Sequence, residues 1–237
     1  MNSGVPEVVP VLRPHSWLLT FDHLPLEDRP IWTFAGDDFI SALYRPAAQH
    51  FVTAGDIAKQ GISLIDAIDT AANNFIAANS SASGLNIQIR PAQAIIDLVS
   101  PQGDHAPGIQ IRADNGYASS WLTHRETLRA VVDTLGRYFN DVPLFFPITT
   151  DLLIAAPTGA DGLELLYQFA MDTYRAAGTD AISALAHTCD DVALQLWTPQ
   201  VARPERRAHL YALQQTTLAP HGHPMPNYSG QGAHILA

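Results

Sequence analysis

The segment Pro143–Pro157, PLFFPITTDLLIAAP, decides the fold class. It contains two apolar runs, Leu144–Phe146 and Leu152–Ala156, separated by a polar step that ends at Asp151. A short run without any polar residue is typical of a strand that is buried on both faces of its sheet. We therefore expect Leu152–Ala156 to be a central strand, with Asp151 at its mouth.

Amphipathic helices are predicted on both sides of this segment, because apolar residues recur there three or four positions apart. The three windows are residues 63–79, 124–139 and 161–176. Ser63 is a candidate N-cap for the first helix, and Gly178 is a candidate stop for the third. Thr123 and Glu126 form a Thr-x-x-Glu capping box ahead of the second helix.

Shorter apolar runs bounded by Pro, Gly or Asp predict further strands. They are residues 17–21, 31–34, 39–44, 85–89, 108–112, 117–122, 144–146 and 192–197. The dipeptide Asn115-Gly116 predicts a hairpin between two of these runs. Ala94–Val99 fits a strand or a helix, and its β-branched residues favour the strand. Because the first half lacks a continuous βαβ alternation, we expect an α+β fold, with a mixed, mostly antiparallel sheet and the three main helices packed on it.

The chain has 237 residues, which is within the range that one compact domain can reach. We expect residues 16–200 to form a single α+β domain, since no linker interrupts them. Residues 1–15 carry three prolines and little periodicity, so we expect an irregular N-terminal segment. Residues 201–237 are predicted to form an irregular C-terminal tail, because proline and glycine gather near their end.

Charge and composition exclude several classes of protein. The formal net charge is −10, which argues against nucleic-acid binding through a basic face but can steer the chain toward a basic partner. No apolar run is long enough to cross a membrane, and no early segment has the pattern of a secretion signal. Cys189 is the only cysteine, so an internal disulfide is impossible and a reducing, cytoplasmic setting is expected.

The common catalytic motifs are absent from the sequence. There is no Gly-x-Ser-x-Gly elbow, phosphate-binding loop or His-Glu-x-x-His helix, and no cofactor is expected. Asp151 is the one candidate catalytic residue, because polar groups at the end of a buried strand often line a site. Capping and turn formation explain Asp151, Thr149 and Thr150 equally well.

Possible metal ligands lie mainly near the C-terminus. His221 and His223 form a His-Gly-His pair that one transition-metal ion could share, although a solvated tail is the alternative. His187 and Cys189 stand beside the pair Asp190-Asp191, and a buried, inert cysteine is the alternative there. The acidic pairs Asp37-Asp38 and Asp190-Asp191 are expected to serve turns, because adjacent strand residues point to opposite faces.

Two stretches of the chain carry a family resemblance. The first is Phe51-Val52-Thr53 followed by Asp56-Ile57, Gly61-Ile62-Ser63 and a helix that ends Ala71-Ala72-Asn73-Asn74-Phe75. The second is Gly116-Tyr117-Ala118-Ser119-Ser120-Trp121-Leu122, followed by a helix and Pro147–Pro157. Together they cover less than half of the chain and resemble segments of the uncharacterised YtpQ-like family of bacterial cytosolic proteins.

This resemblance implies a cytosolic α+β protein and brings no established activity with it. The family tends to have an Arg-Asp pair before its buried apolar strand, whereas here Thr150 precedes Asp151. A role for that arginine therefore cannot be carried over to this chain.

Three functional hypotheses follow from these observations. The first is a non-enzymatic binding or accessory protein, comparable to an immunity protein or a chaperone, that acts through protein–protein interaction with a basic partner. The second is a hydrolase of small molecules that uses Asp151 and a divalent cation. The third is a homo-oligomer joined by exposed tryptophans, although Trp17, Trp32, Trp121 and Trp197 are all expected to pack in the core.

Overall fold

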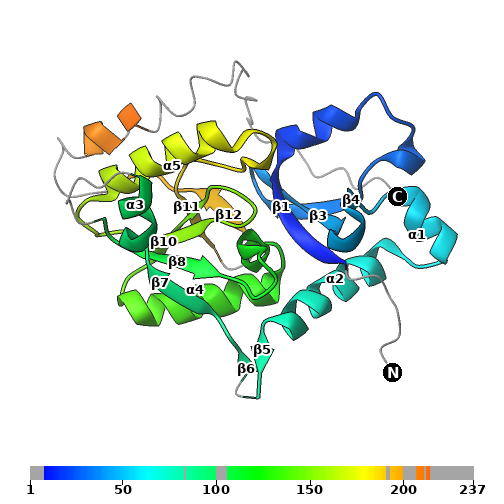
Figure 1. Cartoon of the computed structure of the whole chain (residues 1–237), viewed down its shortest axis with the longest axis horizontal. Coiled ribbons are helices and arrows are strands. Elements are labelled where there is room, and N and C mark those ends of the chain that lie inside the picture. Colours follow the sequence, from blue (N-terminus) through cyan, green and yellow to red (C-terminus); the bar gives the residue numbers. More distant parts are fainter. Residues whose placement is uncertain are drawn as a thin grey trace.

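The computed structural model describes residues 8–82, 84–99, 106–190, 193–199, 207–210 and 212–213. Within them the protein has an α+β fold built on a mixed, mostly antiparallel sheet of ten strands (Figure 1). The strand order is β1-β3-β2-β12-β11-β9-β10-β8-β7, with β4 paired to β3. Among the described strands only β2 and β12 pair in parallel, so the predicted fold class is confirmed.

The elements have the following bounds. The strands are β1 (Val9–Pro14), β2 (Trp32–Gly36), β3 (Phe39–Arg45), β4 (His50–Phe51), β5 (Ser80–Ser81), β6 (Gly84–Leu85), β7 (Gln88–Pro91), β8 (Ile109–Arg112), β9 (Pro143–Pro147), β10 (Leu153–Pro157), β11 (His187–Cys189) and β12 (Leu194–Leu196). The α-helices are α1 (Ala54–Gln60), α2 (Leu64–Ala78), α3 (Gln93–Val99), α4 (Arg125–Phe139) and α5 (Leu163–Ala177). The 3₁₀ helices are η1 (His15–Phe21), η2 (Leu26–Asp28), η3 (Pro46–Ala48), η4 (Ala118–Leu122) and η5 (Gly178–Asp180).

Strand β10 is the central strand that its apolar run predicts. It pairs with β9 on one side and β8 on the other. Leu153 and Ala155 belong to the core cluster that includes residues of α4, while Ile154 and Ala156 belong to the cluster beneath α5. Both faces of the strand are therefore buried, which is why it needs no polar residue.

Within the described residues, the N-terminal strands are covered by an α-helix on one face only. Helix α2 packs Ala67 and Ala71 against Leu43 of β3 on one face of the sheet. The opposite face carries η1 and five aromatic rings in two groups, Trp17 with Phe21 and His15 with Trp32 and Phe34, with neighbouring centroids 4.6–6.2 Å apart within each group. We call this the aromatic face, and its members are His15, Trp17, Phe21, Trp32 and Phe34.

The two halves of the sheet meet at a narrow seam between β2 and β12. The parallel register there consists of the single pair Leu194 and Gly36. A Cβ atom on Gly36 would lie 2.4 Å from the carbonyl oxygen of Leu194, so only glycine permits this approach. The core is nevertheless continuous across the seam, because Phe75 of α2 stacks edge-on against Trp121 of η4 with centroids 5.0 Å apart.

The expectation of irregular termini is wrong for the parts that the structure describes. Val9–Pro14 forms strand β1 and is hydrogen-bonded along its length to β3. Its prolines are tolerated because β1 ends the strand order and one of its sides has no strand neighbour. In the predicted tail, residues 207–210 are helical and Leu210 is buried beside α5 residues, whereas residues 1–7 and 214–237 lie outside the described residues.

The hairpin prediction at Asn115-Gly116 is also wrong. The turn exists, but residues 118–122 form η4 instead of a strand. Strand β8 already has β10 on one side and β7 on the other, so it has no free edge for another partner. Instead, the indole nitrogen of Trp121 donates to the carbonyl of Arg112 at 3.0 Å and ties η4 across the end of β8.

Other local predictions have mixed outcomes. Ser63 caps α2 by accepting a hydrogen bond from the Asp66 amide, as its position predicts. The N-cap of α4 is His124, one residue later than expected, because the Thr123 hydroxyl donates to Ser120 and closes η4. Two predicted strands are helices, namely residues 17–21 in η1 and residues 94–99 in α3.

No helix among the described residues is long and apolar enough to span a bilayer.

Candidate functional site

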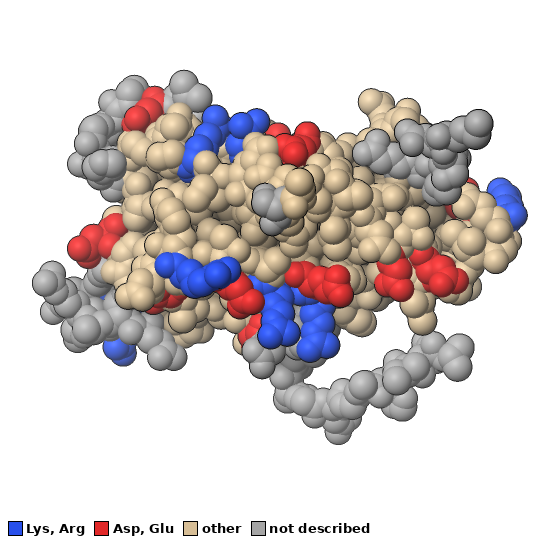
Figure 2. Space-filling model, turned by 90° about the horizontal axis from the view of Figure 1, so that it is seen from below, with Lys and Arg blue, Asp and Glu red and all other residues tan. Residues whose placement is uncertain are grey.

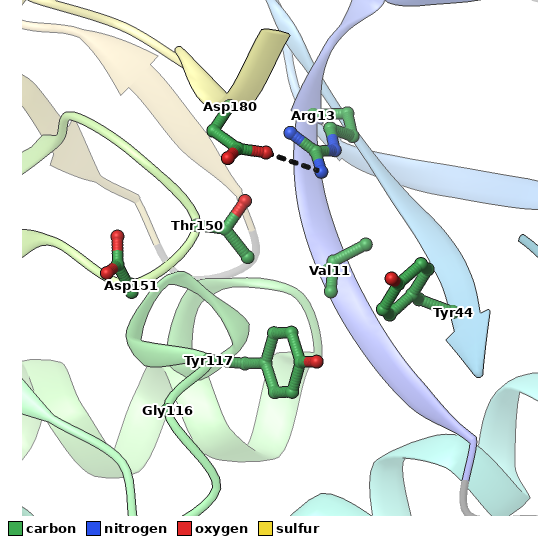
Figure 3. A pocket seen from close by; sticks show the side chains of 8 residues that line it. All are labelled: Val11, Arg13, Tyr44, Gly116, Tyr117, Thr150, Asp151 and Asp180. Atoms are coloured by element: carbon green, nitrogen blue, oxygen red, sulfur yellow. Dashed lines mark ion pairs between the residues drawn. The ribbon is translucent and has the colours of Figure 1, made fainter. Parts of the chain in front are cut away.

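A polar pocket opens where the two halves of the sheet face each other. It has a volume of about 230 Å³. Figure 3 shows Arg13 and Tyr44 on one side of it and Thr150, Asp151 and Asp180 on the other. The full lining is Val11, Arg13, Tyr44, Gly116, Tyr117, Thr150, Asp151 and Asp180. It therefore includes Asp151, the candidate that the sequence singles out.

Arg13 is placed in the pocket by the alternation of β1. Val9, Val11 and Arg13 point to one face of the strand, and Leu12 points to the other, into the main core. The Arg13 side chain is only 10% exposed. Its guanidinium carbon lies 5.6 Å from the centre of the Phe51 ring, which supports the long side chain from β4.

The Arg13 guanidinium is incompletely satisfied. Its Nη2 atom lies 3.9 Å from the Asp180 carboxylate, and its Nη1 atom donates to the Thr179 carbonyl at 3.4 Å. Both contacts are long, and the buried Nε atom has no hydrogen-bond partner. A buried donor left in this state costs about 1–3 kcal/mol.

Burial lowers the pKa of Arg13 below its usual value, and Asp180 and Tyr44 partly offset that effect. An arginine remains protonated under such a shift, because its reference pKa is so high. The pocket therefore contains a positive charge that is removed from water, and the carboxylate paired with it, Asp180, has a side chain that is 71% exposed.

The wall opposite Arg13 comes from the turn between β9 and β10. The Ser119 amide donates to the Thr150 carbonyl at 3.0 Å and fixes this turn against η4. The Thr150 hydroxyl is buried without a hydrogen-bond partner. Asp151 is exposed at the rim and accepts a hydrogen bond of 2.5 Å from the Thr149 hydroxyl. Asp151 therefore has the turn role that the sequence left open, and it also borders the pocket.

Two tyrosine rings complete the floor. Tyr44 from β3 and Tyr117 from the loop before η4 lie edge to face, with centroids 6.1 Å apart. Gly116 precedes Tyr117 with φ of 82°, a left-handed conformation that lets the chain turn sharply into the pocket. The result is a cleft with an arginine, several hydroxyl groups and two aromatic faces.

The polar groups of this pocket can donate and accept hydrogen bonds. The Thr150 hydroxyl has no base within hydrogen-bond distance, so nothing in the pocket activates it as a nucleophile. No group of three or more His, Cys, Asp or Glu residues in the described part of the chain is placed to hold a metal ion. Asp151 therefore borders a pocket, and the described residues form no such group around it.

The other predicted site residues lie elsewhere. His187 is buried beneath Phe39, and burial lowers its pKa to about 3, so it is a neutral core residue. The Cys189 thiol donates to the Asp190 carbonyl at 2.6 Å and borders a separate cavity of about 330 Å³ beside α4. His221 and His223 lie outside the described residues, as does Asp191.

The acidic pair Asp37-Asp38 forms the turn between β2 and β3, as predicted. The Asp38 carbonyl accepts a hydrogen bond from the His15 amide at 2.8 Å. Burial and the neighbouring Asp37 raise the pKa of the Asp38 carboxyl, and His15 lowers it in part.

Among the tryptophans, Trp121 and Trp197 are buried, but Trp17 and Trp32 are half-buried on the aromatic face, which corrects the expectation for those two.

Sequence reasoning missed Arg13. The signal is present, because Arg13 continues the spacing of Val9 and Val11 in an otherwise apolar strand. The prolines at 10 and 14 hide it by suggesting an irregular segment.

Comparisons of the chain with protein-family models, with curated proteins and with solved structures found no match. The resemblance to the YtpQ-like family stays a prediction.

Proposed function

We propose that this is a non-enzymatic binding protein whose ligand places a hydrogen-bond acceptor, most simply an anionic group, against Arg13. The observation that supports this proposal is the buried Nε atom of Arg13, which has no partner although the side chain borders an open pocket. A ligand oxygen at this position would satisfy that donor and balance a buried charge.

The residues around Arg13 support binding without chemistry. Thr150 offers a second unpaired polar atom, and Tyr44 and Tyr117 offer ring faces for contact. Binding pockets commonly combine a few such polar groups with apolar walls. A reaction would also need an activated nucleophile or water, and no described residue provides a base for Thr150.

The test is a ligand-observed NMR screen of small carboxylates, phosphates and sulfates, each paired with a neutral analogue. We expect binders to carry an anionic group and to lose binding in Arg13→Gln. The matched control is Arg45→Gln, because Arg45 is 13% exposed and also has a buried, unpartnered Nε atom but lies outside the pocket. A wild-type protein that binds no compound, or binders that ignore the Arg13 change, would contradict the proposal.

The same samples distinguish binding from catalysis. Spectra of each bound compound are repeated over a day, with and without added Mg²⁺ or Zn²⁺. Unchanged ligand spectra support a binding protein. Conversion of the ligand that disappears in Asp151→Asn would instead establish the hydrolase hypothesis.

A second candidate function is recognition of a protein partner on the aromatic face. Phe34 is 71% exposed there, which is unusual for a phenylalanine in a sheet. The acidic turn Asp37-Asp38 directly follows β2 beside the face, so a partner with basic side chains next to an apolar anchor fits its charge.

Capture of partners from native cytosol tests this second function. A genuine partner would be retained by the wild type, would be lost in Phe34→Ser and would be released by salt. Tyr138→Ser is the matched control, because Tyr138 is 60% exposed but lies on α4. Recovery of untagged copies of the chain itself with the same Phe34 dependence would establish the homo-oligomer instead.

On the face that Figure 2 shows, the acidic side chains do not form one continuous surface. They stand beside basic side chains among many uncharged residues. Net charge alone therefore does not locate a basic partner, and the aromatic face is the more specific place to mutate.

We also propose a cytoplasmic setting, which the single cysteine, Cys189, supports.

A further inference from the structure

The charges around the Arg13 pocket specify more than an acceptor group. One positive side chain, Arg13, and two negative ones, Asp151 and Asp180, line the pocket, so its formal charge is −1. An anion without a compensating positive charge would be attracted by Arg13 but repelled by both carboxylates. The favoured ligand therefore carries both signs of charge.

We infer that the ligand is a free α-amino acid in its zwitterionic form, an inference that rests on the proposed function. Its carboxylate would accept hydrogen bonds from the Arg13 guanidinium and the Thr150 hydroxyl. Its ammonium group would meet the carboxylate of Asp180 at the pocket rim. Each of the two unpartnered polar atoms, Arg13 Nε and Thr150 Oγ1, thereby gains an acceptor.

The separation of the protein charges selects the α-isomer. Asp180 Oδ1 lies 3.9 Å from Arg13 Nη2, so a positive and a negative protein group are close neighbours. In an α-amino acid the ammonium and carboxylate are attached to the same carbon and are equally close. A ligand whose charges are separated by a longer chain would have to fold back to reach both groups, which costs conformational freedom.

The size of the pocket agrees with a ligand of this class. Its volume of about 230 Å³ is below the range of about 300–1,000 Å³ that is typical of sites for drug-sized ligands. Val11 and the rings of Tyr44 and Tyr117 supply the apolar wall on which an amino-acid side chain would rest. Figure 3 shows these three residues below and beside Arg13, away from the Asp180 carboxylate.

The experiment measures binding of the twenty proteinogenic L-amino acids to the full chain, one at a time at about 5 mM, by thermal shift and then calorimetry. For the best binder, three relatives are titrated: the analogue without the amino group, the analogue without the carboxylate, and the β-amino isomer. We expect the two truncated analogues to bind at least about tenfold more weakly, since each loses one charge-assisted contact. The β-amino isomer should also bind more weakly, because its longer spacer must be held in one bent conformation.

Variants connect the binding to the two charged side chains. Asp180→Asn is expected to raise the Kd of the amino acid about tenfold and to leave the Kd of the deaminated analogue unchanged or lower. Its control is Asp172→Asn, since Asp172 is 61% exposed, also lies 3.9 Å from an arginine and does not border the pocket. Arg13→Lys keeps the charge but loses the planar fork, so it should weaken carboxylate binding as well.

The outcomes separate this inference from the proposed function. If the deaminated analogue binds as tightly as the amino acid, and Arg13→Gln abolishes both, the pocket recognises anions and the zwitterion inference is wrong. If none of the twenty amino acids binds while other anionic compounds do, the inference is again wrong and the function stands. Amino-acid binding that survives both Arg13→Gln and Asp180→Asn would overturn the two together.

Discussion

Phe145 of β9 and Phe34 of β2 are the same residue type in strands of one sheet, yet Phe145 is fully buried and Phe34 is 71% exposed. The strands around β9 and β10 have helices over both faces, whereas the strands around β2 have α2 on one face and the aromatic face on the other. The difference teaches that the C-terminal half of the sheet is devoted to stability. The exposed aromatic rings belong to the N-terminal half, and the candidate site lies between the two halves.

The largest effect is expected in the C-terminal half. Phe145→Ala should lower the free energy of unfolding by about 3–5 kcal/mol, because it removes a large ring from a core where no water can replace it. Urea unfolding followed by circular dichroism measures the change. A loss below about 1 kcal/mol would mean that this half tolerates cavities and is not the stability centre.

Next to the seam, on β11, the buried His187 is expected to make stability depend on pH. Its folded pKa is about 3, and an unfolded histidine titrates near 6.5, so only the unfolded chain takes up this proton between these values. The free energy of unfolding should therefore fall by about 1.4 kcal/mol per pH unit as pH drops below about 6.5. His187→Gln should remove about one proton from the slope of urea stability against pH, whereas an unchanged slope would rule out a neutral buried His187.

The glycine at the seam is expected to have an intermediate effect. Gly36→Ala brings a methyl group into the Leu194 carbonyl, which is backbone and cannot swing away, so we expect a loss of about 1–3 kcal/mol. Gly136→Ala is the control, because its nearest outside atom is 3.9 Å away and alanine favours helix α4. That control should gain up to about 1 kcal/mol. Equal outcomes for the two variants would show that β2 and β12 do not need their close approach.

Arg13 should be a residue that serves binding at the expense of stability. Arg13→Met replaces a buried, poorly paired charge by an apolar side chain, so the free energy of unfolding should stay the same or rise by about 1 kcal/mol. Ligand binding should be lost at the same time. If Arg13→Met strongly destabilises the protein in thermal unfolding, Arg13 instead stabilises the contact between the two halves.

The smallest effect is expected on the aromatic face. Phe34→Ser removes a ring that is mostly in contact with water, so the free energy of unfolding should change by less than about 0.5 kcal/mol. Solubility at high concentration should increase as well, because an exposed apolar group is lost. A large destabilisation here would show that the stacked rings support the fold as strongly as the C-terminal core does.

The same contrast explains which parts of the fold are predictable from sequence. Strand β10 and helices α2, α4 and α5 can be predicted from the sequence, because the apolar residues that each of them buries recur at a regular spacing along the chain. Strand β1 is hidden by its prolines, which are acceptable only because of its place at the end of the strand order. The hairpin after β8 fails because β7 and β10 occupy both edges of that strand, and local residues do not report this.

The candidate site is predictable only in part, for the same physical reason. Asp151 is found because a polar residue at the mouth of a buried strand stands out locally. Arg13 stands out as a site candidate only through its burial and its contacts with Thr179 and Asp180, which lie far along the chain. Sequence periodicity can place Arg13 on a face of a strand but cannot supply those neighbours.

The position of β12 in the sheet has a consequence for how the protein is made. Strand β12 lies between β2 and β11, and so it closes an edge of β2 that precedes it by more than 150 residues in the chain. On the ribosome, β1, β2 and β3 emerge before β12, and that edge of β2 stays unpaired until residues 194–196 have been translated. Nascent chains are therefore exposed to intermolecular strand pairing during this interval, and helper proteins that shield strand edges should increase the yield of folded molecules.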